Sequence, residues 1–229
     1  MPLSTALDRL PSLIAIDGPA ASGKTSVGRA LVQHFGYRFL DTGVTYRAVT
    51  LAALRTGISP ADEAACAALA GRLDIRLEPD GTRTSLGEED VTELIRGPEV
   101  ESNVSSYSAL PAVREVMVRL QRRFAAEGHA VLAGRDIGTV VLPDAPLKFY
   151  LQASEAARAE RRSAQATSWG PAQATAEARR DITLRDRKDS SRAVSPLQAA
   201  PDAIVIDTTD LALEDLIARV IEAVECAAA

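Results

Sequence analysis

A glycine-rich segment with one lysine and one threonine carries the clearest chemical signal in the chain. Residues 18–25 read G-P-A-A-S-G-K-T and fit the pattern G-x-x-x-x-G-K-[ST]. Glycines let backbone N–H groups wrap closely around phosphate oxygens, and the N-terminus of a following helix adds partial positive charge. Lys24 would reach the β- and γ-phosphates, and the Thr25 hydroxyl would ligate Mg²⁺. The segment therefore predicts a site for a nucleoside triphosphate. Its predicted binding residues are Gly18, Pro19, Ala20, Ala21, Ser22, Gly23, Lys24, Thr25 and Ser26.

The flanking residues predict the elements that must hold this loop. Residues 12–17 form a short apolar run, which is typical of a buried strand. From Lys24 the apolar positions Val27, Leu31 and Phe35 recur every four residues, and Gly36 follows as a helix stop. A strand, a glycine-rich turn and a helix together open an α/β unit.

Strand and helix patterns alternate along the rest of the chain. Further strands are predicted at residues 38–41, 130–133, 147–151 and 203–207, and helices at 45–55, 60–70, 111–127, from 155, and 214–226. Ser59 has the form of an N-cap before Pro60, and Ser154 caps the helix from residue 155. This alternation implies an α/β protein with a parallel sheet covered on both faces.

Residues of about 72 to 104 interrupt that pattern. Leu73, Ile75 and Leu77 alternate with charged residues, which indicates a half-exposed strand. Residues 79–81 are a turn, residues 82–86 a partner strand, and residues 87–90 another turn. We expect a small β-rich insertion here.

The composition restricts the class of protein. The 229 residues are 46% hydrophobic, which excludes disorder as the main theme, and no apolar run is long enough to cross a membrane. The N-terminus does not resemble a secretory signal, and two distant cysteines suit a reducing cytoplasm. The net charge of −5 argues against nucleic-acid binding. We therefore expect a cytoplasmic protein without a membrane or nucleic-acid partner.

One segment runs against the acidic balance. Residues 155–192 carry nine Lys/Arg against six Asp/Glu. This basic segment is a candidate anion site, although a solvated helix with internal ion pairs would have the same composition.

Four sequence blocks make the chain similar to a known family. They are I-D-G-P at residues 16–19 running into the G-K-T, L-D-T-G-V-T-Y-R at 40–47, G-R-D-I-G-T-V-V at 134–141, and R-D-R-K-D-S-S-R at 185–192 followed by P-L at 196–197. In order and spacing they resemble the bacterial cytidylate kinases, of the nucleoside monophosphate kinase family. No N-K-x-D sequence of the GTPase type is present.

The resemblance implies a fold and a division into domains. We expect a three-layer P-loop NTPase fold with a small inserted β-rich NMP-binding domain and a helical lid. The expected parts are an N-terminal extension at residues 1–11, a core at 12–71 and 105–229, a lid at about 158–192, and the insertion at 72–104. A monomer is implied by the resemblance alone.

The resemblance also implies roles for individual side chains, because phosphoryl transfer depends on alignment and charge compensation, which arginines provide. The implied catalytic residues are Lys24, Arg135, Arg185 and Arg192. The implied CMP-binding residues are Thr42, Tyr46, Arg47, Ser105, Arg114, Arg135, Asp136, Arg185, Asp189 and Arg192. The implied lid arginines on the ATP phosphates are Arg158, Arg161 and Arg162.

Base choice has a physical logic. Cytosine presents a 4-amino donor beside an N3 acceptor, and uracil reverses both. A carboxylate from Asp136 and a guanidinium from Arg114, with Ser105 assisting, would suit cytosine and leave uracil with unpaired polar groups.

The implied activity is transfer of the γ-phosphoryl group of ATP, with Mg²⁺, to CMP or dCMP. Dual UMP/CMP specificity, another small acceptor, an ATP-binding regulatory module and a nucleic-acid binder using the basic segment are the alternatives. Because the acceptor arginines accompany the P-loop, the sequence favours a kinase over a module that only binds ATP.

Overall fold

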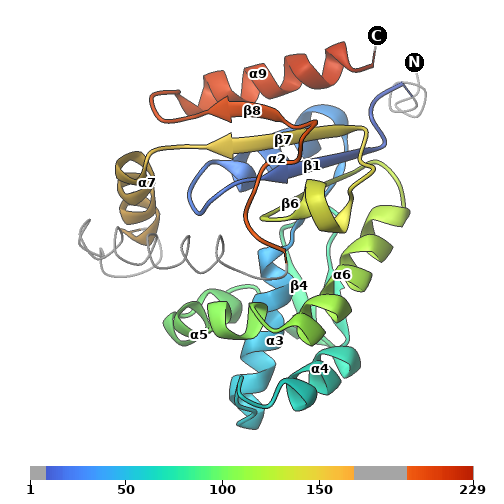
Figure 1. The fold of residues 1–229 in the computed structure, drawn as a ribbon, viewed down its shortest axis with the longest axis vertical. Coiled ribbons are helices and arrows are strands. Elements are labelled where there is room, and N and C mark those ends of the chain that lie inside the picture. Colours follow the sequence, from blue (N-terminus) through green and yellow to red (C-terminus); the bar gives the residue numbers. More distant parts are fainter. Residues whose placement is uncertain (1–8, 168–194, 229) are drawn as a thin grey trace.

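The computed structural model describes residues 9–167 and 195–228, with side chains described up to residue 164 in the first range. The fold has a main sheet with helices on both sides and a second group of helices at one end (Figure 1). Within the described ranges, no helix combines the length and the apolar composition that a bilayer crossing requires.

Five parallel strands make the main sheet, in the order β2-β6-β1-β7-β8. The strands are β1 (Leu13–Asp17), β2 (Arg38–Asp41), β6 (Ala130–Gly134), β7 (Leu147–Gln152) and β8 (Ile204–Asp207). β6 is buried at every position and β1 at every position after Leu13, as expected for a sheet covered on both faces. The predicted strands are all present, with ends that differ by a residue or two.

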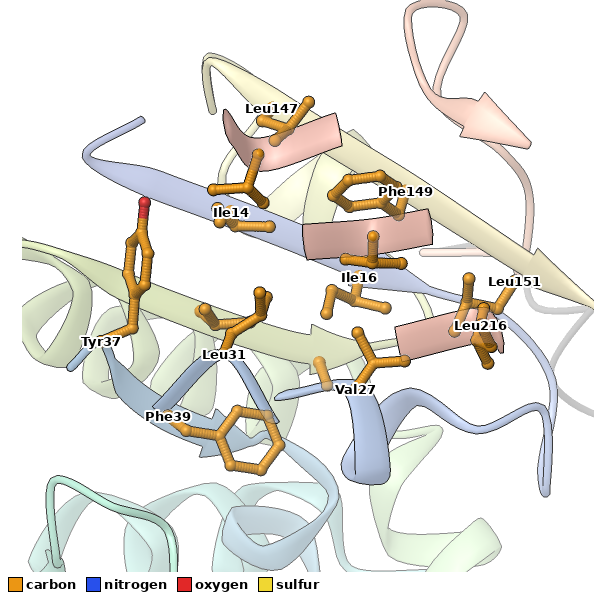
Figure 2. Packing of buried hydrophobic residues seen from close by; sticks show 14 of the residues in the cluster. Ile14, Ile16, Val27, Leu31, Tyr37, Phe39, Leu147, Phe149, Leu151 and Leu216 are labelled. Atoms are coloured by element: carbon orange, nitrogen blue, oxygen red, sulfur yellow. The ribbon is translucent and has the colours of Figure 1, made fainter. Parts of the chain in front are cut away.

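Alternate residues of β1 separate the two faces of the sheet. Ile14 and Ile16 pack with α2 (Lys24–Phe35) and α9 (Leu213–Cys226) in one buried cluster, whose side chains Figure 2 shows interdigitating. Ala15 points to the opposite cluster, which is closed by α6 (Pro111–Ala126) and the turn η2 (Ile137–Val141). The predicted three-layer arrangement is therefore confirmed.

A second group of elements lies beside the sheet, below it in Figure 1. It comprises α3 (Gly43–Thr56), α4 (Glu63–Arg72), the short turn η1 (Leu94–Arg96) and α5 (Pro98–Ser108). With α6, these helices share an apolar cluster of their own that includes Val49, Cys66 and Met117. A three-stranded antiparallel sheet joins them, formed by β3 (Ile75–Leu77), β4 (Thr84–Leu86) and β5 (Glu89–Asp90). Helix α7 (Glu155–Thr167) follows β7.

Three local expectations were wrong. Helix α4 is capped by Asp62, which accepts from the Ala65 N–H, whereas Ser59 accepts from Ala61 in the preceding turn. Residues 87–90, expected as a turn, contribute Glu89–Asp90 as an edge strand. The segment 72–104 is not β-rich throughout, because α5 begins at Pro98, a residue suited to the first helical position. Ser154 does cap α7, by accepting from the Ala157 N–H.

One glycine tests how tightly α2 packs on the sheet. A Cβ added to Gly28 would lie 2.0 Å from a ring carbon of the buried Phe39, whereas a Cβ on Gly71 in α4 would meet nothing within 4 Å. We expect Gly28→Ala to lower the free energy of unfolding by about 1–3 kcal/mol through overpacking. Gly71→Ala should raise it by about 0.5 kcal/mol through helix propensity. Urea denaturation measures both, and equal stability of the two variants would contradict this packing.

Candidate active site

The carboxyl ends of three neighbouring strands meet at one edge of the main sheet. Asp17 of β1 lies opposite Gly134 of β6, and Asp41 of β2 lies opposite Ala133. The loops that follow these strands therefore emerge side by side and line one pocket.

The first of these loops is the glycine-rich segment. At Gly18, φ is 150° and an added Cβ would lie 2.1 Å from the carbonyl oxygen of Leu151, so only glycine fits. Gly23 takes a φ of 100° directly before α2 begins at Lys24. Lys24 is buried and its Nζ donates to the Pro19 carbonyl oxygen at 2.6 Å, which holds the ammonium over the loop. The segment thus has the form of a phosphate-binding loop.

The pocket brings together residues from five separate parts of the chain. Sequence-predicted residues that line it are Ala20, Ala21, Ser22, Gly23, Lys24, Thr25, Ser26, Thr42, Tyr46, Arg47, Arg114, Arg135, Asp136 and Arg162. The predicted triphosphate loop and the predicted acceptor residues therefore share one cavity.

A buried ion pair crosses the acceptor side of this pocket. Arg114 Nη2 of α6 lies 2.5 Å from Asp136 Oδ2, and both side chains are almost fully buried. The guanidinium of Arg114 also donates to the Ser108 carbonyl oxygen and lies 5.2 Å from the ring centre of Tyr46. Buried charges require such pairing, so the two side chains fix each other's orientation. Beside them, the Thr42 hydroxyl donates to the Ala133 carbonyl oxygen.

Asp17 holds the turn that carries Asp136. Its two carboxylate oxygens accept from the backbone N–H groups of Ile137 and Gly138 at 2.8 and 2.7 Å. Burial raises the pKa of Asp17 to about 6, although these two N–H groups oppose the shift. The sequence block I-D-G-P contains this aspartate, but no role for it was predicted.

Four of the predicted phosphate-binding arginines differ in how they reach the loop. Arg135 Nη1 donates to the Gly18 carbonyl oxygen at 3.0 Å, and Arg158 donates to the Ala20 carbonyl oxygen at 3.4 Å. Arg161 turns away and binds the hydroxyl and carbonyl of Thr208. Arg162 lines the pocket and pairs with Glu101 of α5.

Some predicted residues are not brought to the pocket. Ser105 contributes only its carbonyl oxygen to the Ser108 hydroxyl, and Ser108 lines the pocket in its place, one turn further along α5. Gly18 and Pro19 belong to the loop and Arg158 contacts it, but none of the three lines the pocket. Arg161 does not line it either, because it binds Thr208. Arg185, Asp189 and Arg192 lie outside the described residues.

Sequence reasoning missed residues that the structure places at the site. The Asp41 carboxylate accepts from the Thr25 hydroxyl at 2.8 Å and lines the pocket. It stands inside the L-D-T-G block, so its position at the end of a strand could have indicated it. Glu101 and Ser108 carried no such signal, because α5 itself was not predicted.

Comparison with known proteins explains the four sequence blocks at residues 16–25, 40–47, 134–141 and 185–197. The family model described as cytidylate kinase matches residues 14–226 of the chain. The chain belongs to the cytidylate kinase family.

Relatives from several bacteria support membership of the cytidylate kinase family. A cytidylate kinase of Mycolicibacterium paratuberculosis is 52% identical over 87% of this chain and 89% of its own length. Another, of Rhodococcus opacus, is 48% identical over 91% of this chain and 93% of its own. Among solved structures, a shikimate kinase of Acinetobacter baumannii in complex with shikimate covers 97% of each chain at 17% identity with a TM-score of 0.49.

The substitution Asp17→Asn tests whether burial of the Asp17 carboxyl group makes the stability of the fold depend on pH. The folded chain binds the Asp17 proton more tightly than the unfolded chain, whose pKa is about 3.9. The protonated group therefore favours folding fully below about pH 4, and this contribution is lost as the pH rises through about 6. Raising the pH from 4 to 7 should therefore lower the free energy of unfolding of the wild type relative to that of Asp17→Asn, by up to about 3 kcal/mol.

Urea denaturation at each pH measures the difference. Asp207→Asn is the matched control, because hydrogen bonds from Thr209 lower the pKa of that exposed carboxyl group and reverse the sign of its contribution. Parallel stability curves for wild type and Asp17→Asn would contradict the role of burial.

Proposed function

We propose that the chain is an ATP-dependent (d)CMP kinase that transfers the γ-phosphoryl group of ATP to CMP or dCMP, giving ADP and CDP or dCDP. The observation that carries this proposal is the buried Arg114–Asp136 pair in the same pocket as the phosphate-binding loop. A loop of this kind serves many reactions, so the groups facing it must choose the acceptor.

The pair supplies donors and acceptors in the pattern that cytosine requires. The ion pair occupies Oδ2 of Asp136, and no described residue donates a hydrogen bond to Oδ1. We assign that carboxylate to the 4-amino group of cytosine and the Arg114 guanidinium to N3 or O2. Uracil would set its O4 acceptor against a buried carboxylate, which is costly.

Charge compensation and alignment are the remaining tasks of the site. We assign Lys24 to the β- and γ-phosphates and Arg47 and Arg135 to the acceptor phosphate, since all three line the pocket. Arg162 would face the transferring group. By resemblance, Arg185 and Arg192 join the phosphate contacts and Asp189 contacts the ribose.

The oxygens beside the loop suit Mg²⁺. The Thr25 hydroxyl and an Asp41 carboxylate oxygen lie 2.8 Å apart in the pocket, and hard oxygen ligands of this type, together with phosphate oxygens, are what Mg²⁺ prefers. We propose that Thr25 holds the ion, which when bound neutralises charge on the β- and γ-phosphates.

Other properties follow from the same proposal. We place the enzyme in the cytoplasm, as a monomer, with nucleotides and no nucleic acid as its ligands. We also retain the division into a core, an insertion at residues 72–104 and a lid at about 158–192. Both cysteines are free thiols in the structure, which suits a reducing compartment.

A coupled assay of ADP release with ATP and Mg²⁺ tests the activity. We expect rapid release with CMP and dCMP, slow release with UMP or AMP, and almost none without an acceptor. Equal rates with UMP would remove the base-reading assignment but keep a kinase. Release without acceptor, or none with any acceptor, would leave an ATPase or an ATP-binding module.

Asp136→Asn tests the base-reading assignment directly. The substitution replaces the carboxylate that faces the cytosine amino group with a neutral amide. We therefore expect the ratio of kcat/KM for CMP to that for UMP to fall by about 10- to 100-fold. Asp202→Asn is the matched control, because it removes the partner of another buried cation, Lys148, outside the pocket. An unchanged ratio in Asp136→Asn, or an equal fall in Asp202→Asn, would contradict the assignment.

A further inference from the structure

One carboxylate joins two arginines that line the pocket from different parts of the chain. Glu101 of α5 pairs through Oε2 with Arg47 Nη1 of α3, and through Oε1 with Arg162 Nη2 of α7 at 2.7 Å. Helices α5 and α7 lie on the same side of the molecule in Figure 1. Glu101 therefore links the helix group beside the sheet to the helix that follows β7.

The link has electrostatic consequences. Two guanidinium groups directed at one pocket repel each other, and a carboxylate between them offsets that repulsion. The side chains of Arg47, Glu101 and Arg162 are 13, 30 and 37% exposed, so solvent screens these pairs less than it screens pairs on an open surface.

The geometry leaves N–H groups of both arginines for a phosphate. Arg47 donates to Glu101 and to the Ile95 carbonyl oxygen through the same atom, Nη1. Arg162 binds Glu101 through Nη2. Among the described residues, Nε and Nη2 of Arg47 and Nε and Nη1 of Arg162 take part in no hydrogen bond or ion pair. In Arg47, Nε and Nη2 form the side-on edge with which an arginine grips a phosphate through two N–H groups, and Arg162 keeps N–H donors on Nε and Nη1 for single contacts.

We infer that Glu101 is a positioning residue: it ties Arg47 to Arg162 and holds both guanidinium groups toward the pocket before nucleotide phosphates arrive. The inference rests on the proposed function, in which Arg47 serves the acceptor phosphate and Arg162 the transferring phosphate. A side chain fixed in its working geometry loses less conformational freedom when the ligand binds.

The Glu101 carboxylate could also weaken phosphate binding, and this opposite prediction allows a sharp test of the inference. A negative charge beside a phosphate site also repels phosphate, so a residue that merely competed for the arginines would weaken CMP binding. Removing its charge would then lower KM for CMP. A positioning residue gives the reverse result, because both arginines lose their common anchor.

Glu101→Gln and its matched control Glu99→Gln separate these outcomes. The glutamine keeps the shape but can accept from only one arginine, since its amino group faces the other. We expect kcat/KM for CMP to fall about tenfold and KM for CMP to rise, in line with the loss of one charge-assisted hydrogen bond. Glu99→Gln makes the same charge change on the exposed face of α5 and should stay within about twofold of wild type.

Two further measurements separate positioning from a general loss of structure. Calorimetric titration with CMP in the absence of ATP should show about fivefold weaker binding by Glu101→Gln, with an unchanged melting temperature. In an Arg162→Gln background, Glu101→Gln should cost distinctly less than it does alone, since the two side chains act through one contact. Glu101→Asp, which keeps the charge, should recover part of the loss.

An unchanged or lower KM for CMP in Glu101→Gln would overturn the inference, as would fully additive losses with Arg162→Gln. If wild type and Glu99→Gln both release ADP with CMP, such a result removes only the role of Glu101. If the wild type shows no CMP-dependent release, the proposed function fails and the inference fails with it.

Discussion

The ion pair between Arg114 and Asp136 is the constraint around which the pocket is arranged. Both charges are buried, and a buried charge without a partner costs several kcal/mol, so neither side chain can move without the other. The pair joins α6 to the turn after β6, and its two residues are 22 positions apart in the sequence. Well-packed apolar residues could give equal stability at such a place, which is why we propose a recognition role for this pair.

The backbone around that pair is fixed from the side of the phosphate-binding loop. Asp17 ends β1, directly before Gly18, and its carboxylate accepts from the two N–H groups that follow Asp136. The phosphate-binding loop and the turn that carries Asp136 are thus both attached to Asp17. Because parallel strands β1 and β6 run in register to this edge, a few residues set the relative positions of the loop and of this turn.

Much of the fold and most of the pocket lining follow from sequence because their signals are local. Apolar runs place the strands, and the G-K-T loop and the G-R-D-I-G block place Lys24 and Asp136 at strand ends. Helix α5 escaped prediction because only Val100, Val104 and Tyr107 mark its apolar face in an otherwise polar sequence, and its burial depends on α3 and α6. Ser105 was expected from the family resemblance alone, and no local signal marked Ser108 or Glu101. The pairing of Glu101 with Arg162 spans 61 residues, and no local pattern encodes it.

Each positively charged side chain of the pocket has an oxygen partner nearby. Lys24 and Arg135 rest on carbonyl oxygens of the phosphate-binding loop, and Arg114 rests on Asp136. Arg47 and Arg162 share one carboxylate. A chain of net charge −5 can therefore gather five cations in one cavity without attracting polyanions over its whole surface. Each cation is held by a neutral oxygen or by a carboxylate that also serves a second group. A nucleotide phosphate therefore still meets positive charge. Such a pocket suits small phosphorylated ligands by its local geometry, because its positive charge is confined to one cavity.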